Sequence, residues 1–370
     1  MILMLPSFQN ISMETTKEIH VETTNDYIIV TYDFNLDDRP TAAFDLDYTI
    51  IKTKSTKKFP VDKDDWLYLY DHTDSFLRTL SKTHNIVIFS NQAGLKKTIK
   101  KEAFMEKIVN IIKDLSIPIK IYVSIENGFF RKPLTGLWGL YKMLKNNTND
   151  SNTDDFYCGD AAGRKGDFSD TDFMFSQNIG VKFHTPEQLF LNKKEVIEYK
   201  MPNYLADYIG KLEDIVLPKI DKLLIMMCGY QGSGKSTISQ SFDMPLASND
   251  IQGTKGKCKK FVVKQLKEDK NIIVDNTNHT KENREEYIQL AKEYDYHSVI
   301  IYIDNDINFC YYMNQLRCEL SKGKSKLIPK IAYYTLRKKF EIPDESECDT
   351  LIKISNKVNL KLLKYMFPSI

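Results

Sequence analysis

Two aspartates separated by a single residue, Asp45 and Asp47, lie near the start of the chain and directly follow a short apolar segment. A carboxylate can attack phosphorus and form an aspartyl-phosphate, which divides one difficult reaction into two easier steps. A second carboxylate nearby can protonate the leaving oxygen and later take a proton from the attacking water. The pair therefore indicates a site that removes phosphate, with Asp45 as the nucleophile and Asp47 as the general acid and base.

Polar residues later in the chain could complete this site. Ser90 and Asp160 each follow an apolar segment typical of a buried strand, and Lys132 supplies a cation. Because ligands bind at the carboxyl ends of parallel strands, we expect Asp45 and Asp160 to converge. Two carboxylates can approach an anionic phosphate only with a divalent cation, so we expect Asp45 and Asp47 to bind Mg²⁺. A turn or a helix cap would explain an isolated acidic pair, but it does not explain all of these residues together.

A glycine-rich segment past the middle of the chain has the spacing GxxxxGK[ST]. It follows the apolar segment 223–228 and precedes a stretch with helical character, which is the context that supports a nucleotide-binding loop. We expect backbone N–H groups to bind the phosphates of ATP, Lys235 to reach the β- and γ-phosphates, and Ser236 to bind Mg²⁺. The predicted loop consists of Gly229, Tyr230, Gln231, Gly232, Ser233, Gly234, Lys235, Ser236 and Thr237.

Three residues after this loop are candidates for the rest of a kinase site. Asp250 could accept a proton from an attacking hydroxyl, and a helix N-cap is its alternative role. Asp275 follows another apolar segment and could lie near the water shell of the metal. Arg317 is placed like an arginine that folds over the triphosphate, and a solvated arginine on a helix is the alternative.

The segments that must position these residues alternate between two patterns. Apolar runs predict strands at 27–32, 42–44, 86–89, 119–123, 156–158, 223–228, 271–274 and 299–303. Helical spacing predicts helices at 71–83, 101–115, 257–268, 281–294, 307–320 and 330–340. Strands that alternate with helices favour parallel sheets covered on both faces. The sequence therefore predicts an α/β protein.

Length and composition limit the remaining possibilities. At 370 residues the chain exceeds one ordinary core, and we expect an extension at 1–40, a phosphatase domain at 41–195, a linker at 196–220 and a kinase domain at 221–370. An apolar share of 42% without a run long enough for a membrane span is typical of a globular protein outside the membrane. Six cysteines without paired spacing favour a reducing compartment and do not favour zinc.

Residues 43–343 resemble the bifunctional polynucleotide kinase 3′-phosphatases of eukaryotic type. The order of acidic pair, hydroxyl, lysine and final acid in the first half is the order used by the haloacid dehalogenase-like superfamily. The segments that carry the resemblance are 43–47, 58–60, 88–92, 131–138, 159–164, 167–169, 185–187, 274–278, 328–329 and 337–341. The resemblance implies a haloacid dehalogenase-like Rossmannoid phosphatase followed by a P-loop kinase.

The same resemblance implies a function and further residue roles. The protein would use Mg²⁺ and ATP to remove 3′-phosphates from DNA ends and to phosphorylate 5′-hydroxyls, which prepares breaks for ligation. Asp160 would bind Mg²⁺ with support from Asp172, Ser90 and Lys132 would stabilise the transferred phosphoryl group, and Asp250 would be the base of the kinase. We also expect a monomer inside the cell, in either nucleus or cytoplasm. The family's forkhead-associated domain does not fit into residues 1–40, so docking to phosphorylated scaffolds is not expected.

Three residues differ from the family pattern and keep alternatives open. Tyr48 replaces a usual glycine and could narrow the phosphatase mouth, whereas Asn249 and Gln315 replace arginines near the kinase site. The alternatives are the same chemistry on RNA ends, a kinase and phosphatase of small metabolites, and a 3′-phosphatase whose weakened kinase domain acts mainly in binding. The basic segments 254–260 and 322–330 could line a path for nucleic acid.

Overall fold

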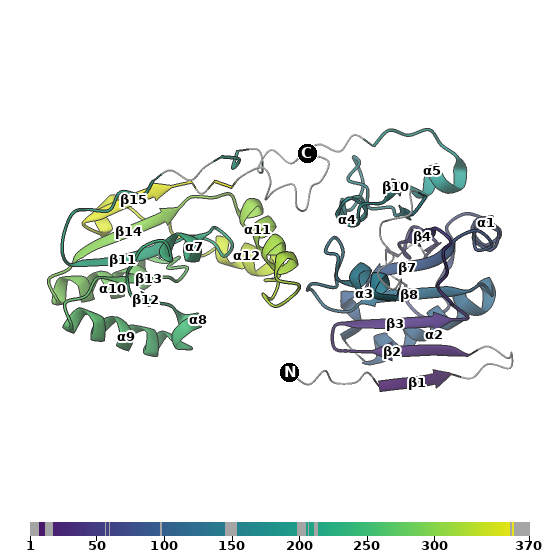
Figure 1. The fold of residues 1–370 in the computed structure, drawn as a ribbon, viewed down its shortest axis with the longest axis horizontal. Helices are drawn as coiled ribbons and strands as arrows, with labels where there is room; N and C mark the ends of the chain where they lie inside the picture. Colours follow the sequence, from purple (N-terminus) through teal and green to yellow (C-terminus); the bar gives the residue numbers. More distant parts are fainter. Residues whose placement is uncertain are drawn as a thin grey trace. The chain divides into compact units, whose positions relative to one another are not determined.

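The protein is an α/β protein whose chain forms two compact units (Figure 1). The computed structural model describes residues 7–11, 18–55, 57–58, 60–96, 98–144, 154–197, 205, 207–210, 214–355 and 357–358. The first unit comprises Met1–Lys200, Cys318–Leu327 and Lys364–Ile370, and the second comprises Met201–Arg317 and Ile328–Leu363. The predicted extension 1–40 and linker 196–220 lie partly outside the described residues. No helix among the described residues is long and apolar enough to cross a membrane.

The first unit is built on an eight-stranded sheet with the strand order β1-β2-β3-β8-β7-β4-β9-β10. Its strands are β1 (Ser7–Ile11), β2 (Ile19–Thr23), β3 (Tyr27–Tyr32), β4 (Thr41–Phe44), β7 (Asn85–Asn91), β8 (Ile119–Ser124), β9 (Phe156–Cys158) and β10 (Lys182–His184). From β8 to β10 all neighbours are parallel. The carboxyl ends of β4, β7 and β9, where the predicted phosphatase residues begin, therefore lie at one edge of the sheet.

The amino-terminal part differs from the prediction of one strand and an all-parallel sheet. Strands β1, β2, β3 and β8 pair in antiparallel fashion, so the sheet is mixed. The missed strand β2 buries Ile19 and Val21 but exposes His20 between them. Such half-buried alternation over five residues gives a weaker signal than the continuous apolar runs of central parallel strands. The predicted extension thus contributes three strands to the first sheet.

Helices pack on both faces of this sheet. They are α1 (Thr73–Leu80), α2 (Thr98–Leu115), α3 (Gly136–Leu144), α4 (Thr171–Ile179) and α5 (Pro186–Leu191), with a small hairpin of β5 (Ile51–Lys52) and β6 (Leu67–Tyr68) after β4. Because successive strand residues point to opposite faces, the sheet carries two apolar layers. On one face Ile88 packs in a cluster with Phe104 of α2. On the other face Phe89 contacts Trp138 of α3 and Phe175 of α4.

The second unit has a five-stranded parallel sheet with the order β12-β13-β11-β14-β15. Its strands are β11 (Leu223–Cys228), β12 (Leu246–Ala247), β13 (Ile272–Val274), β14 (His297–Ile303) and β15 (Thr350–Ile354). Its helical segments are α7 (Lys235–Ser239), α8 (Asn249–Gln252), α9 (Lys255–Lys267), α10 (Lys281–Glu293), α11 (Ile307–Leu320) and α12 (Lys330–Arg337). Of α11, the part up to Arg317 belongs to this unit. Met226 of the central strand packs with Val262 and Ile288, whereas Met227 packs with Ile238 of α7. The strand β11 leads directly into the predicted nucleotide loop.

Candidate active sites

The turn after β4 places Asp45 at the centre of the carboxyl edge of the first sheet. The backbone N–H of Asp45 donates to the carbonyl of Cys158 in β9, at 2.8 Å, so the residue still belongs to the edge of the sheet. The chain then turns back, and the backbone N–H groups of Ile50 and Ile51 both donate to the carbonyl of Leu46. Asp45 itself is only 9% exposed. A buried carboxylate at this position needs a partner of opposite charge.

Lys132 is that partner. Its Nζ lies 2.6 Å from Asp45 Oδ1 and 2.8 Å from Asp172 Oδ1, and it also donates to Tyr157 Oη at 2.7 Å. Burial raises the pKa of Asp45, and the charge of Lys132 opposes that rise. Burial would lower the pKa of Lys132, but the charges of Asp172 and Asp45 outweigh burial and raise it. The lysine is therefore a fixed cation between two acidic groups.

Three carboxylates gather around this lysine. Asp45, Asp160 and Asp172 each offer an oxygen, and these oxygens lie within 4.8 Å of one another. Burial and the charge of Asp172 raise the pKa of Asp160 to about 7. Carboxylate oxygens are the ligands that Mg²⁺ prefers, and three carboxylates with one lysine retain excess negative charge. The donor set therefore fits a divalent cation, with Asp172 as a full member of the group.

Glycine is required where Asp172 approaches the sheet. A Cβ atom on Gly159 would lie 2.5 Å from Cγ of Asp172, closer than non-bonded atoms can come. With no side chain there, Asp172 Oδ2 accepts from the backbone N–H of Ala161 at 3.1 Å. The backbone N–H of Asp160 donates to Thr49 Oγ1 at 3.1 Å, which joins the loop after β9 to the loop after β4.

Asp47 is not a member of the carboxylate group among the described residues. Its Oδ2 accepts from Gln92 Nε2 at 2.5 Å, and its Oδ1 lies 3.4 Å from Nζ of Lys107 in α2. Gln92 Nε2 also donates to the buried Ser90 Oγ at 3.0 Å. The sequence analysis missed Gln92 and Lys107. The available signal was a lysine three residues after Phe104, on the apolar face of the predicted helix.

Tyr48 takes an unusual backbone conformation beside this site. Its φ is +60°, in the left-handed region that favours glycine. Its Oη donates to the carbonyl of Lys58 at 2.8 Å, and the residue is 38% exposed. Lys58 in turn places its Nζ 3.7 Å from the ring centre of Phe168, which is 83% exposed. The tyrosine thus connects the loop of Asp47 to a basic and aromatic surface.

The nucleotide loop of the second unit adopts the backbone that its glycines allow. Gly232 and Gly234 have φ values of +76° and +98°. A Cβ atom on Gly232 would collide with the carbonyl oxygen of Cys310 in α11. Lys235 points back into its own loop, where Nζ donates to the carbonyls of Gly229 at 2.9 Å and Tyr230 at 2.6 Å. The loop is therefore formed, and its lysine is held by backbone acceptors.

Other elements fix the position of this loop. Tyr333 of α12 donates from Oη to the carbonyl of Gln231 at 3.0 Å. Tyr230 stacks on Phe340, with ring centres 4.8 Å apart. Burial lowers the pKa of Lys235, and the negative charge of Asp275 opposes this change. Asp275 is itself buried directly after β13, and its charge acts on the loop lysine.

The two remaining kinase candidates are exposed. Asp250 lies in the first turn of α8, whose N-cap is Ser248, because Ser248 Oγ accepts from Ile251 N at 3.1 Å. The alternative role of Asp250 as the N-cap is thus filled by another residue. Arg317 is exposed in the last turn of α11, and its positive charge contributes to the lowered pKa of Lys235. Arg317 also donates to Asn314 Oδ1 at 3.2 Å.

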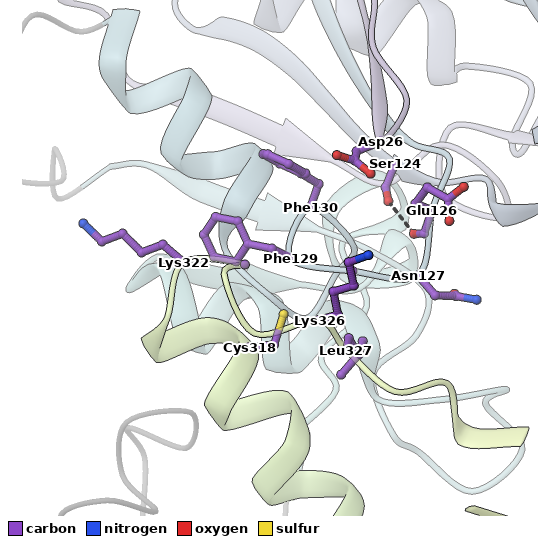
Figure 2. Close-up of a pocket in the computed structure, with 12 residues that line it drawn as sticks. Asp26, Ser124, Glu126, Asn127, Phe129, Phe130, Cys318, Lys322, Lys326 and Leu327 are labelled. Atoms are coloured by element: carbon purple, nitrogen blue, oxygen red, sulfur yellow. Dashed lines mark hydrogen bonds between the residues drawn. The ribbon is translucent and has the colours of Figure 1, made fainter. Parts of the chain in front are cut away.

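A further pocket in the first unit is separate from these residues. Figure 2 shows that it is lined by Ser124 and Phe129, together with Lys322 and Lys326 of the segment Cys318–Leu327, which belongs to this unit. Ser124 Oγ donates to the carbonyl of Glu126 at 3.1 Å. None of the residues that line this pocket is a predicted catalytic or metal-binding residue. Its lysines belong to one of the two basic segments singled out in the sequence.

The fold and the two sites define the class of the protein. It is an α/β enzyme in which a phosphatase with an aspartate centre is joined to a P-loop kinase. Residues 40–190 match the family described as polynucleotide kinase 3 phosphatase. Residues 246–349 match the family described as chromatin associated protein KTI12. The chain is 34% identical over 332 residues to the bifunctional polynucleotide phosphatase/kinase of Schizosaccharomyces pombe, which covers 87% of this chain and 80% of that protein.

Two other relatives extend this comparison. A protein of Acanthamoeba polyphaga mimivirus named for the same two activities is 32% identical over 352 residues, covering 83% of this chain and 82% of that protein. The polynucleotide 3′-phosphatase of Saccharomyces cerevisiae is 30% identical over 204 residues and covers 40% of this chain and 86% of that protein. The chain therefore belongs to the bifunctional polynucleotide phosphatase/kinase family.

Proposed function

We propose that this protein heals nucleic-acid ends by removing 3′-phosphates and by transferring phosphate from ATP to 5′-hydroxyls, with DNA as its substrate. The observation that carries the proposal is the joint presence of an assembled acid–lysine centre and a formed nucleotide loop in one chain. The named relatives with both activities align with more than four-fifths of this chain, so the similarity includes both units. The products, a 3′-hydroxyl and a 5′-phosphate, are the ends that a ligase joins.

In the phosphatase reaction, Asp45 attacks the phosphorus of the 3′-phosphate and the bond to the sugar oxygen breaks. Asp47 gives a proton to that oxygen, and later takes one from the water that hydrolyses the aspartyl-phosphate. Lys132 and Ser90 stabilise the charge on the transferred group from the buried side of the site. Mg²⁺ held by Asp45, Asp160 and Asp172 would reduce the repulsion between these carboxylates and the phosphate.

In the kinase reaction, the loop that begins at Gly229 binds the phosphates of ATP through its backbone N–H groups. Lys235 exchanges its two carbonyl acceptors for phosphate oxygens, and Ser236 would hold Mg²⁺. Asp250 accepts the proton of the 5′-hydroxyl, whose oxygen forms the new bond to the γ-phosphorus while ADP leaves. Arg317 is exposed close enough to influence Lys235 and can add positive charge to the triphosphate.

The same proposal includes an intracellular, monomeric protein. No disulfide joins the six cysteines, all of which lie among the described residues, and five of them are buried. Unpaired thiols are the usual state in a reducing compartment.

A nicked duplex that carries a 3′-phosphate and a 5′-hydroxyl at the break tests the proposed function directly. We expect both ends to be converted when Mg²⁺ and ATP are present, and only the 3′ end when ATP is left out. Matched substrates with DNA or RNA at the break compare the two polymers. A higher rate on the RNA break would identify RNA as the substrate and RNA repair as the function. A higher rate on a free sugar phosphate would contradict the proposed action on nucleic-acid ends.

A further inference from the structure

Lys107 is a buried lysine that the proposed mechanism leaves without a role. Its side chain is only 3% exposed on α2, between residues of the apolar core such as Phe104 and Ile108. Burial of an ammonium group costs free energy unless the charge is paired. The ion pair that the structure gives it is with Asp47, at 3.4 Å between Nζ and Oδ1. The lysine thus places its charge at the carboxylate assigned as the general acid.

Gln92 contacts the other oxygen of the same carboxylate. Its backbone N–H donates to the carbonyl of Ser124 in β8 at 2.7 Å, which fixes the residue at the sheet edge. Its Nε2 then donates to Asp47 Oδ2 at 2.5 Å and to Ser90 Oγ at 3.0 Å. The two oxygens of Asp47 therefore each have a donor from a different rigid element, one from the end of β7 and one from α2.

This arrangement restricts a side chain that would otherwise be mobile. Asp47 lies on a turn and its side chain is 37% exposed, so without partners it would sample several rotamers. Each carboxylate oxygen has two lone-pair sites, so one donor per oxygen leaves room for the transferred proton. The contacts fix where the carboxyl group lies and still allow it to give and take a proton.

We propose that Lys107, together with Gln92, is a positioning residue that holds Asp47 in place for proton transfer to the leaving 3′ oxygen. This inference rests on the proposed phosphatase function and on the role of Asp47 in it. In the first step the Asp45–phosphorus bond forms, the bond from phosphorus to the sugar oxygen breaks, and the proton of Asp47 moves to that oxygen. Loss of Lys107 impairs this step when the leaving group requires a proton.

The dependence on the leaving group separates positioning from a merely structural role. A sugar alkoxide leaves poorly without a proton, whereas p-nitrophenolate leaves without one. The quantity to measure is kcat/KM, because it reports the reaction only up to formation of the aspartyl-phosphate. We expect Lys107→Met to lower kcat/KM for a 3′-phosphorylated oligonucleotide by about tenfold or more, and to leave that for p-nitrophenyl phosphate nearly unchanged. Equal losses on both substrates would overturn the inference.

A matched control and a second variant complete this test. Lys113→Met changes an exposed lysine of the same helix and should leave both kcat/KM values unchanged. If Lys107→Met fails to fold, Lys107→Gln replaces it. Because the amide can still donate a hydrogen bond, we expect a smaller loss of kcat/KM, again confined to the oligonucleotide.

A double-mutant comparison distinguishes failure of this inference from failure of the proposed function. Asp47→Asn should lower kcat/KM selectively for the oligonucleotide, and adding Lys107→Met to it should cause no further loss. If the two losses multiply, Lys107 does not act through Asp47, and the inference is wrong while the function stands. If Asp47→Asn spares the oligonucleotide, the assignment of Asp47 fails, and the positioning role fails with it.

Discussion

The two active sites of this protein differ in how many of their side chains already hold the contacts that catalysis requires. In the first unit, Lys132 already contacts Asp45 and Asp172, and all three of these side chains are buried. In the second unit, Lys235 donates to two carbonyls of its own loop, and the candidate base Asp250 is exposed. The fold therefore fixes the side chains of the phosphatase site. In the kinase site it fixes the backbone of the loop, and the side chains take their final positions when a nucleotide binds.

This difference follows from the chemistry of each reaction. An aspartate nucleophile must be held in line with phosphorus, so its position has to be set by the fold before the substrate arrives. A P-loop binds phosphates through backbone N–H groups, so the loop shape matters first and the lysine can turn afterwards. Mutations should therefore affect both stability and activity in the first unit, and mainly activity in the second.

The largest effect should separate the two sites completely. Asp45→Ala should lower 3′-phosphate release by about 10⁴-fold or more because the nucleophile is lost, and it should spare phosphorylation of 5′-hydroxyls. Lys235→Ala should have the reverse effect. Both activities can be scored on the same nicked duplex, and loss of both with either variant would show that the sites are not independent.

The lysines of the two sites should differ in their contribution to stability. Lys132→Met leaves two buried carboxylates without their cation, and we expect a loss of about 2–4 kcal/mol in the free energy of unfolding. Lys235→Met removes hydrogen bonds to two carbonyls and should cost about 1 kcal/mol. Denaturant unfolding in the presence of EDTA measures both values. Equal losses would contradict the distinction between fixed side chains in the first site and a fixed backbone in the second.

Metal binding should show a pH dependence that belongs to the first unit. Burial and Asp172 raise the pKa of Asp160 to about 7, above the ~3.9 of an exposed aspartate. The folded state therefore binds this proton more tightly than the unfolded state, and the stability from this group is lost as pH rises through about 7. Mg²⁺ should then raise Tm more at about pH 8 than at about pH 5.5. Asp160→Asn should remove most of this difference, and an equal rise at both values would contradict the prediction.

The smallest effect is expected at the mouth of the phosphatase site. Tyr48→Gly relieves a backbone with φ of +60° but loses the hydrogen bond to Lys58, so the free energy of unfolding should change by less than about 1 kcal/mol. If the tyrosine narrows the entrance, the variant should act relatively better on duplex than on single-stranded 3′-phosphate ends. Tyr48→Phe, which retains the ring, should keep the wild-type ratio of kcat/KM for the two substrates.

The sequence predicted the central parts of the fold better than the edges. The strands Phe156–Cys158 and Leu223–Cys228 and the helix Ile307–Leu320 have the predicted bounds, and the two strands are buried along their whole length. The strands β2 and β15 were missed because β2 alternates in burial and β15 is only half-buried or exposed. A continuous apolar run is a strong local signal, and a partly exposed edge strand is a weak one.

Local sequence signals also predicted some residues of the phosphatase site and missed others. Asp45 and Asp160 could be placed near each other, because each directly follows a strand of one sheet. The contact of Lys107 with Asp47 could not be predicted, because it joins a helix to a turn 60 residues earlier. That contact depends on how α2 packs on the sheet, which no local pattern records. Residues that position catalytic groups from another layer are therefore the ones that the sequence reveals least.

The most direct test of the account is to trap the phosphorylated enzyme. A substrate with a labelled 3′-phosphate is mixed with the protein and Mg²⁺, the reaction is stopped with acid within its first turnover, and the labelled peptide is identified by mass spectrometry. We predict an acid-stable, hydroxylamine-sensitive phosphate on Asp45, and none in Asp45→Ala. Label on another residue, or release of phosphate without any labelled enzyme, would contradict the claim that Asp45 receives the phosphoryl group.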